Sequence, residues 1–226
     1  YDLQSMQRVA TAAAHGMADE LGMQRPKNVT CVKPSGTMSK IMDTTEGIHK
    51  PLGRYIFNNV NFGKHDPLVA LLTEAGYDVR PNPGDPEGML VTFPVAWDNV
   101  EFDRHNGMEV NLESALTQLN RYKKYQQNWT QQNTSVTISY DPTEVPEIID
   151  WLEANWECYV GVSFLYRADP TKTAEDLGYL YLPQAVVTKE EFDEYSARLR
   201  PIELDSAYEL DAILDDDCAG GACPIR

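Results

Sequence analysis

The sequence Pro34-Ser35-Gly36-Thr37-Met38-Ser39 directly follows the apolar, β-branched run Val29-Thr30-Cys31-Val32, and the two together decide how the chain is interpreted. A β-branched run that stops at Pro-Ser-Gly predicts a strand over 28–33 that ends in a tight turn. Met38, Ile41 and Met42 then fall at helical spacing, which predicts that the turn opens a short helix. The expected local structure is therefore a strand, a turn of small residues and a helix start.

Such an arrangement points several free backbone N–H groups at one spot. Small residues let an anion approach these donors, and the helix dipole favours negative charge there. The hydroxyls of Ser35, Thr37 and Ser39 add further donors. Residues Pro34, Ser35, Gly36, Thr37, Met38 and Ser39 are thus predicted to bind phosphate. The alternative is an ordinary capped turn, because Ser and Thr commonly cap helices, and the residues alone leave both interpretations open.

The composition is that of a folded globular protein of one large or two small domains. The chain has 226 residues, of which 42% are hydrophobic, and a net charge of −16. A chain this acidic, with no cluster of basic residues, is not expected to bind nucleic acid. No apolar run approaches the length of a membrane span, and no signal peptide opens the sequence. Since the first residue is Tyr1, we expect a processed chain or a piece of a longer one.

The four cysteines fall into two pairs of different character. Cys31 and Cys158 lie in apolar, strand-like runs and are expected to be buried, reduced and inert. Cys218 and Cys223 lie in a polar tail with two glycines between them. This usage fits a cytoplasmic protein rather than a secreted disulfide framework. The four histidines are scattered, which predicts structural roles and no zinc site.

Periodicity and capping residues predict alternating helices and strands, and hence an α/β fold. Helices are expected over 3–21, from Asp66-Pro67 to Gly76, and from Asn111, Asp141-Pro142 and Thr188. Strands are expected over 89–95, 134–140 and 159–165, and a loop over 80–88. The helix after Asp141 is expected to face the core through Val145, Ile148, Ile149 and Leu152.

The character of the sequence changes after residue 200. The segment 201–217 is rich in Asp and Glu and contains no Lys or Arg, and it is interpreted as a flexible acidic arm. Its apolar residues leave open the alternative that it docks as a short helix. The tail 218–226 follows it. A dithiol on a flexible arm can exchange with a disulfide elsewhere and then meet a reductant, so Cys218 and Cys223 are interpreted as a redox carrier. An adventitious pair and a metal-binding pair remain as alternatives.

Several motifs together resemble the C-terminal half of ribonucleotide reductase catalytic chains. They are Val32-Lys33-Pro34-Ser35-Gly36-Thr37, Gly47-Ile48-His49, Arg54-Tyr55-Ile56, Gln132-Asn133-Thr134-Ser135-Val136-Thr137-Ile138 and Gly161-Val162-Ser163-Phe164-Leu165. The ending Cys218…Cys223-Pro224-Ile225-Arg226 is similar to that of the monomeric, adenosylcobalamin-dependent (class II) type. The resemblance covers nearly the whole chain in order.

The resemblance implies the second half of a ten-stranded α/β barrel, over residues 1–200. In that family a finger loop inside the barrel presents the cysteine that becomes a thiyl radical, and a second cysteine pair reduces the ribose 2′ position. By resemblance, the turn from Ser35 to Ser39 would bind the substrate's phosphates. Cys218 and Cys223 would re-reduce the active-site disulfide and accept electrons from thioredoxin. Adenosylcobalamin would be the cofactor of the complete enzyme.

The chain also departs from the family in ways that limit what it does alone. The family's Asn-x-Cys-x-Glu finger-loop triad is absent, and no internal cysteine pair has the context of the reducing pair. The first half of the barrel and the allosteric nucleotide site are missing as well. We therefore expect a fragment, an intein product or one subunit of a reductase encoded in two pieces, which needs an N-terminal partner. The alternative is a non-catalytic nucleotide-binding or redox-carrier module.

Overall fold

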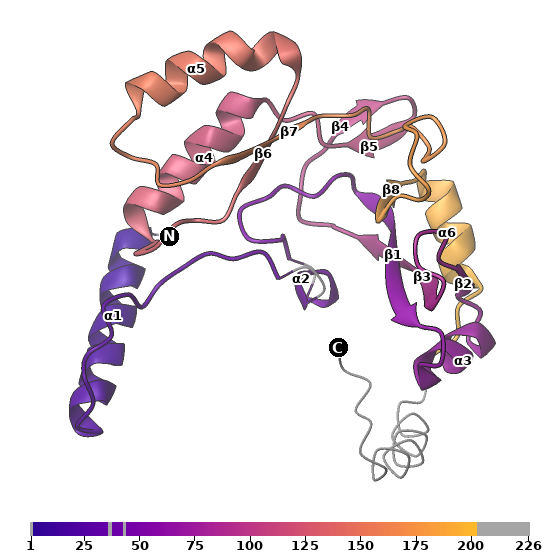
Figure 1. Cartoon of the computed structure of the whole chain (residues 1–226), viewed down its shortest axis with the longest axis horizontal. Coiled ribbons are helices and arrows are strands. Elements are labelled where there is room, and N and C mark those ends of the chain that lie inside the picture. The colour runs from indigo at the N-terminus through magenta and orange to yellow at the C-terminus, as the bar shows by residue number, and fades with distance from the viewer. Residues whose placement is uncertain (1, 36–37, 43, 203–226) are drawn as a thin grey trace. The chain divides into compact units, whose positions relative to one another are not determined.

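The computed structural model describes residues 2–35, 38–42 and 44–202. They form two compact units (Figure 1). Unit 1 takes its described residues from Tyr1–Leu52, Trp97–Asp103 and Asn111–Pro170. Unit 2 takes its described residues from Gly53–Ala96, Arg104–Val110 and Thr171–Arg226. Each unit is built from chain segments far apart in the sequence, so each depends on long-range packing.

Unit 1 is mainly helical. Its helices are α1 (Leu3–Glu20), α2 (Met38–Ile41), α4 (Ala115–Asn128) and α5 (Val145–Ala154), the last preceded by the 3-10 turn η1 (Pro142–Glu144). Helix α1 confirms the helix predicted over 3–21, and the Asp2 side chain caps it by accepting the N–H of Gln4. The short helix α2 follows the turn, as the sequence predicts, and it begins at Met38.

A pair of parallel strands gives unit 1 its α/β character. Strand β6 (Thr137–Tyr140) pairs with β7 (Ser163–Tyr166), with Thr137 opposite Ser163 and Tyr140 opposite Tyr166. Parallel neighbours need a crossover connection, which η1 and α5 supply. The outcome is a βαβ unit, the building block expected of a parallel barrel.

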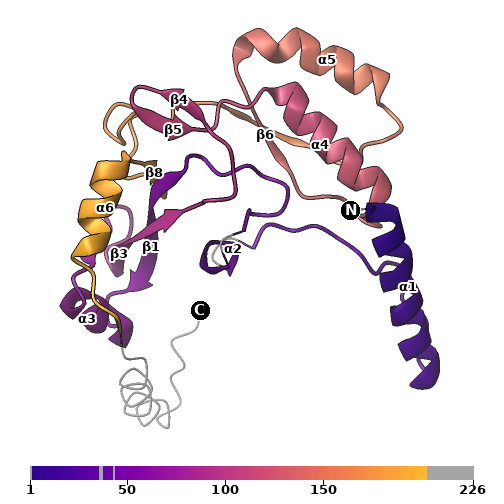
Figure 2. The same ribbon diagram turned by 180° about the vertical axis from the view of Figure 1, so that it is seen from behind.

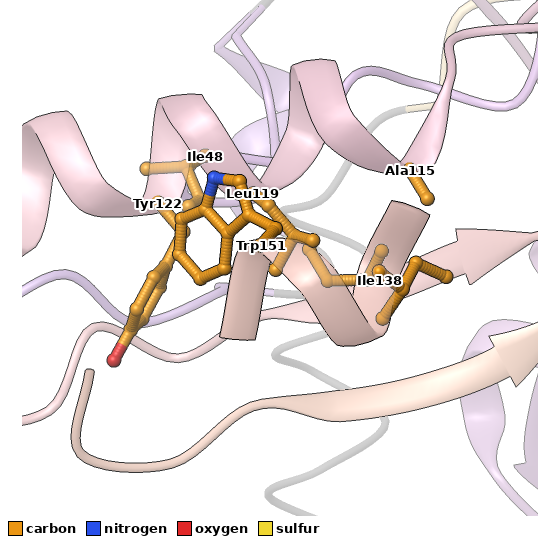
Figure 3. Packing of buried hydrophobic residues seen from close by; sticks show 7 residues of the cluster. Ile48, Ala115, Leu119, Tyr122, Ile138 and Trp151 are labelled. Carbon is orange, nitrogen blue, oxygen red and sulfur yellow. The ribbon is translucent and has the colours of Figure 1, made fainter. Parts of the chain in front are cut away.

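The core of unit 1 lies between α4, α5 and β6 (Figure 3). Seven buried residues form it: Ile48, Ala115, Leu119, Tyr122, Ile138, Ile148 and Trp151. Burying side chains of this size stabilises each by roughly 1.5–3 kcal/mol relative to exposure. Because Ile48 comes from the connection after α2, this core also holds the region of the predicted phosphate turn in place.

Unit 2 is built on a four-stranded antiparallel sheet of order β2-β3-β1-β8 (Figures 1 and 2). The strands are β1 (Tyr55–Gly63), β2 (Asp78–Pro81), β3 (Gly88–Ala96) and β8 (Gln184–Val186). Strand β1 is central and pairs along its whole length with β3, from Tyr55 opposite Ala96 to Gly63 opposite Gly88. Helices α3 (Pro67–Glu74) and α6 (Lys189–Ala197) and the strands β4 (Asp103–His105) and β5 (Met108–Val110) complete the element list.

Helix starts that rest on local capping chemistry are confirmed. Asp66 caps α3 through the N–H of Leu68, and Gly76 follows its end with a φ of 92°. Asp141 and Glu144 form the predicted capping box. Thr188 and Glu191 form a second capping box at the start of α6. These bonds join residues two or three positions apart, so the sequence alone specifies them.

The strand predicted over 28–33 is wrong, since this segment is irregular in the structure. The reason is that a side chain replaces a partner strand: Gln131 Oε1 accepts the N–H groups of Val29 at 2.6 Å and Thr30 at 3.2 Å. The expected burial of Cys31 is wrong for a related reason. Thr30 is buried and Val32 packs on the core, which turns Cys31, between them, out to solvent. Cys158 is half-buried beside the core.

Three further predictions need correction. The segment 80–88 is only in part a loop, because Arg80 and Pro81 belong to β2 and Gly88 begins β3. The sequence analysis also misses β1. Its Asn-rich sequence disfavours a strand, yet antiparallel partners on both edges stabilise it. Helix α4 begins after Ser114, not Asn111, because the Ser114 side chain accepts the N–H of Thr117.

Element limits and faces also differ from expectation around α5. The strands predicted over 134–140 and 159–165 are shorter, at 137–140 and 163–166. On α5, Ile148 is buried and Leu152 packs on the core, whereas Val145 and Ile149 are exposed. Trp151 takes the place that was expected for Ile149, because it lies three residues after Ile148 on the same helix face.

The acidic arm over 201–217 lies outside the described residues except for its first two positions, and the tail 218–226 lies wholly outside them. Gly36 and Thr37 are outside them as well. Among the helices that are described, none has both the length and the apolar character needed to cross a membrane.

Candidate phosphate-binding site

The predicted phosphate turn, residues 34–39, leads into α2, and Ser35 caps that helix. The Ser35 Oγ atom accepts the backbone N–H of Ser39 at 2.9 Å. This bond is the one that the capped-turn alternative predicts. Pro34, Ser35 and Met38 are exposed to solvent, whereas Ser39 is buried. A capped helix start of this kind can still bind an anion, because a cap satisfies only one of its N–H groups.

Ser39 is the residue of the turn that the cap does not explain. Its side chain is buried, with 3% of the residue exposed. Its Oγ atom has no hydrogen-bond partner among the described residues. An unsatisfied buried hydroxyl costs roughly 1–3 kcal/mol, so native structures retain few of them. A bound acceptor such as a phosphate oxygen would satisfy it.

The segment that enters the turn is fastened to residues 133–135. Lys33 Nζ donates to Ser135 Oγ at 2.9 Å and to the carbonyl of Asn133 at 3.3 Å. The N–H of Ser135 donates to the carbonyl of Val32 at 3.2 Å. The motif 132–138 therefore lies beside the entry to the turn.

The Gly47-Ile48-His49 motif lies against the same segment. Gly47 has a φ of 59°, and a Cβ atom there would lie 3.3 Å from Val32 Cγ1 and 3.4 Å from the nitrogen of Pro34. Both the left-handed backbone and the close approach therefore require glycine at this position. The connection 44–49 also contacts α2, since the N–H of Thr44 donates to the Ser39 carbonyl at 2.9 Å.

Tyr122 joins two other motifs of unit 1. Its buried hydroxyl donates to Asn133 Oδ1 at 3.1 Å and accepts the N–H of Val160 at 3.0 Å. The N–H of Gly161 donates to the same Asn133 oxygen at 3.3 Å. The starts of β6 and β7 are thus held together through one side chain of α4.

The structure brings together four of the six motifs, and it adds residues that the sequence analysis missed. Motifs 32–37, 47–49, 132–138 and 161–165 are in unit 1, whereas Arg54-Tyr55-Ile56 begins β1 in unit 2, where Arg54 forms an ion pair with Glu109. Cys218 and Cys223 lie outside the described residues. The missed residues are Lys40 and Glu46, which form an ion pair behind the turn. Opposite charges on one helix face lie three or four residues apart, whereas Lys40 and Glu46 are six apart, so the sequence pattern did not indicate this pair.

Unit 1 also contains a cavity of about 280 Å³ beside the connection 44–49. Its lining includes Thr45, His49, Lys50, Arg121 and Tyr125. The Arg121 guanidinium forms an ion pair with Glu113 and donates a hydrogen bond to the Ile48 carbonyl, so these donors are already used within the protein. Within residues 2–35, 38–42 and 44–202, no group of three or more His, Cys, Asp and Glu side chains is placed to hold a metal ion.

Comparison with known proteins identifies the fold. A crystal structure of a B12-dependent (class II) ribonucleotide reductase matches 92% of this chain and 28% of its own chain, with a TM-score of 0.74 and 21% sequence identity. The chain therefore has the fold of one part of a class II ribonucleotide reductase, consistent with a partial α/β barrel. No protein-family model matches the chain.

Curated relatives make the resemblance more specific. The probable adenosylcobalamin-dependent ribonucleoside-triphosphate reductase of Dictyostelium discoideum is 27% identical, over 88% of this chain and 26% of that protein. The adenosylcobalamin-dependent ribonucleoside-triphosphate reductase of Levilactobacillus brevis is also 27% identical, over 98% of this chain and 30% of that protein. The resemblance inferred from the motifs is confirmed, and the chain spans less than a third of the length of these relatives.

Proposed function

We propose that this chain is the C-terminal subunit or fragment of a ribonucleoside-triphosphate reductase, and that it acts with an N-terminal partner. The buried, unpartnered hydroxyl of Ser39 carries the proposal, because it lies in the motif that the resemblance assigns to phosphate binding. Residues Pro34 to Ser39 bind the phosphates of a ribonucleotide. The names of the curated relatives support a triphosphate substrate.

The need for a partner follows from what the chain lacks and from what it exposes. Its sequence contains no Asn-x-Cys-x-Glu triad. Strand β7 pairs with β6 along one edge, and its residues Phe164, Leu165 and Tyr166 are exposed apolar side chains. An exposed apolar strand of this kind is typical of an interaction surface, and it favours aggregation when nothing covers it. The partner supplies that surface and the cysteine that becomes the thiyl radical.

The tail cysteines carry electrons between turnovers. In each turnover the partner's cysteine pair gives two electrons to the ribose and becomes a disulfide, while the 2′-hydroxyl leaves as water. A thiolate of Cys218 or Cys223 attacks that disulfide, and a second exchange leaves the partner's pair reduced and Cys218 bonded to Cys223. A dithiol of the thioredoxin type then reduces the tail. The cytoplasm, which keeps thiols reduced, is the matching compartment.

Adenosylcobalamin, for which the relatives are named, is assigned to the complete enzyme. The cavity of about 280 Å³ in unit 1 is at the lower limit of pockets that enclose drug-sized molecules, and a corrinoid is larger than such molecules. This cavity therefore does not fit the cofactor. We assign no residue of this chain to the cofactor and no step to it.

The test is reconstitution. The purified chain is mixed with adenosylcobalamin, a ribonucleoside triphosphate and dithiothreitol, with and without the polypeptide from a neighbouring reading frame that carries the triad. Deoxyribonucleotide is expected only with both polypeptides. Turnover by this chain alone would contradict the proposal, and binding of nucleotide without any turnover in the mixture would favour a non-catalytic module.

A pair of variants tests the phosphate turn in the same assay. Gly36→Val adds a branched side chain where phosphate must approach closely, and Thr37→Ala removes one hydroxyl donor, worth roughly 1 kcal/mol. Both are expected to raise the substrate KM, Gly36→Val by more. An unchanged KM in Gly36→Val would show that phosphate binds elsewhere.

A further inference from the structure

We propose that His49 is a positioning residue for the phosphate turn, acting through a chain of contacts that runs from β6 to α2. This role rests on the proposed function of residues 34–39, and it concerns a side chain that the motif comparison leaves without a role. Among the described residues, the ring of His49 is hydrogen-bonded to Glu46 and Thr137 and not to the turn. It holds the connection 44–49, which contacts the chain just before the turn and also the start of α2.

The first step is the tautomer of His49. Its Nδ1 atom lies 2.8 Å from the Glu46 carbonyl, and its Nε2 atom lies 2.9 Å from the backbone nitrogen of Thr137. A carbonyl can only accept and a backbone N–H can only donate. Nδ1 therefore carries the proton and Nε2 is the acceptor. The neutral ring joins the connection 44–49 to the first residue of β6.

The connection 44–49 contacts both ends of the turn. On the incoming side, Gly47 lies directly against Val32 and Pro34. On the outgoing side, the N–H of Thr44 donates to the Ser39 carbonyl at 2.9 Å. The side chain of Lys40, the residue next to Ser39, is only 8% exposed and forms an ion pair with Glu46.

These contacts form one continuous path. Thr137 is fixed in the parallel pair with β7 and is the rigid end of the path. His49 is hydrogen-bonded to the Glu46 carbonyl, and the Glu46 side chain pairs with Lys40 on α2, so the positions of these residues are coupled. Thr44 bonds to the carbonyl of Ser39, and Glu46 pairs with the next residue, Lys40. The position of the Ser39 N–H and hydroxyl therefore depends on β6. Loss of the His49–Thr137 bond therefore loosens the donors of the turn without removing any of them.

Two substitutions distinguish the role of Nε2 from that of Nδ1, because each keeps only one of the two hydrogen bonds of the ring. In His49→Gln the side-chain oxygen reaches the position of Nε2 and can still accept from Thr137. In His49→Asn the amide nitrogen replaces Nδ1 and can still donate to Glu46, but the link to β6 is lost. The full-length chain is studied by amide hydrogen exchange at Thr137, Thr44 and Ser39. His49→Asn is expected to speed exchange at all three by about fivefold, the loss of one ordinary hydrogen bond, while His49→Gln stays near wild type.

Faster exchange in His49→Gln than in His49→Asn would overturn the proposal. A side chain that only closes its own turn needs the Nδ1 hydrogen bond to Glu46 and not the Nε2 hydrogen bond to Thr137. Unchanged exchange at Thr44 and Ser39 in both variants would overturn it too. Glu46→Gln is a second variant that keeps the side-chain shape and weakens the ion pair with Lys40. It is expected to speed exchange at Ser39 and Thr44 but not at Thr137, and a response at Thr137 alone would contradict the path. His15→Asn, on α1, is the control and should change none of the three amides.

Titration of the same samples with inorganic tripolyphosphate separates this inference from the proposed function. Wild-type chain is expected to show amide shifts at Ser35 and Ser39, with a Kd that rises about fivefold in His49→Asn and little in His49→Gln. No shift in wild type would count against the phosphate turn, while the exchange data would still decide the role of His49. A Kd that is equal in all variants would show that His49 does not position the turn for phosphate.

Discussion

The hydroxyl oxygen of Ser35 lies 2.9 Å from the backbone nitrogen of Ser39 and accepts its hydrogen bond. This single bond closes the turn that the sequence assigns to phosphate. It also means that the Ser39 N–H is occupied in the described structure, whereas the Ser39 hydroxyl is buried and unpartnered. The cap and the anion site are therefore compatible, because they use different groups of the same residue.

Removing the cap is expected to weaken α2 and the turn together. Ser35→Ala leaves the Ser39 N–H without its acceptor, which costs about 1 kcal/mol of local stability. Amide exchange at Ser39 should be faster, and the substrate KM of the reconstituted enzyme should rise. Ser35→Thr keeps the hydroxyl and is the matched control. Equal exchange at Ser39 in wild type and Ser35→Ala would show that the cap contributes nothing.

The tail cysteines should matter only between turnovers. Chemistry on a pre-reduced enzyme uses the partner's cysteines, so Cys218→Ser or Cys223→Ser should leave a single turnover nearly intact. Continued turnover with thioredoxin should be abolished, and dithiothreitol should restore it in part because a small thiol diffuses into the site. Product per enzyme with each reductant is the measurement.

The length of the acidic arm provides a control for that experiment. The arm sets the effective concentration of the tail at the site, so deleting most of 202–217 should have the same effect as the cysteine variants with thioredoxin. Multiple turnover with thioredoxin that is equal in wild type and both Ser variants would show that another group carries the electrons.

Tyr122 should be important for the stability of unit 1. Tyr122→Phe removes the hydroxyl that bridges Asn133 and Val160 beside the core. An ordinary hydrogen bond contributes roughly 0.5–1.5 kcal/mol, so the free energy of unfolding in urea should fall by about 1 kcal/mol. Tyr125→Phe is the comparison, because the Tyr125 hydroxyl makes no hydrogen bond among the described residues. Equal losses in the two variants would contradict a bridging role.

The start of η1 should show a measurable pH signature. Asp141 accepts hydrogen bonds from the side chain and the N–H of Thr143, and these hold the pKa of Asp141 below its ordinary value of 3.8. A depressed carboxylate pKa adds stability above the ordinary value, and this stability is lost as the pH falls through the folded-state pKa. Thr143→Ala should raise the pKa of Asp141 toward 3.8 in an NMR titration, whereas Thr143→Ser should not. A pKa that is the same in wild type and Thr143→Ala would rule out this cause.

Features that depend on neighbours within a few positions could be predicted from the amino-acid sequence. The helix starts at Asp66, Asp141 and Thr188 are readable because cap and capped group lie two or three residues apart. The short helix α2 is readable from the helical spacing of Met38, Ile41 and Met42. The motifs also indicated the family resemblance, since short functional segments keep their order even at 27% identity.

Features that depend on partners far away in the chain could not be predicted in this way and became visible only in the folded structure. Gln131 takes the N–H groups of Val29 and Thr30, so a β-prone run stays irregular. Asn-rich β1 becomes the central strand of unit 2 because β3 and β8 pair with both of its edges. The same holds for the site. The Ser39 hydroxyl is buried with no partner among the described residues, and His49 reaches Thr137, because folding brings together residues that lie far apart in the chain. Local propensities differ by at most about 1 kcal/mol per residue, and long-range hydrogen bonds and packing of similar or larger free energy override them.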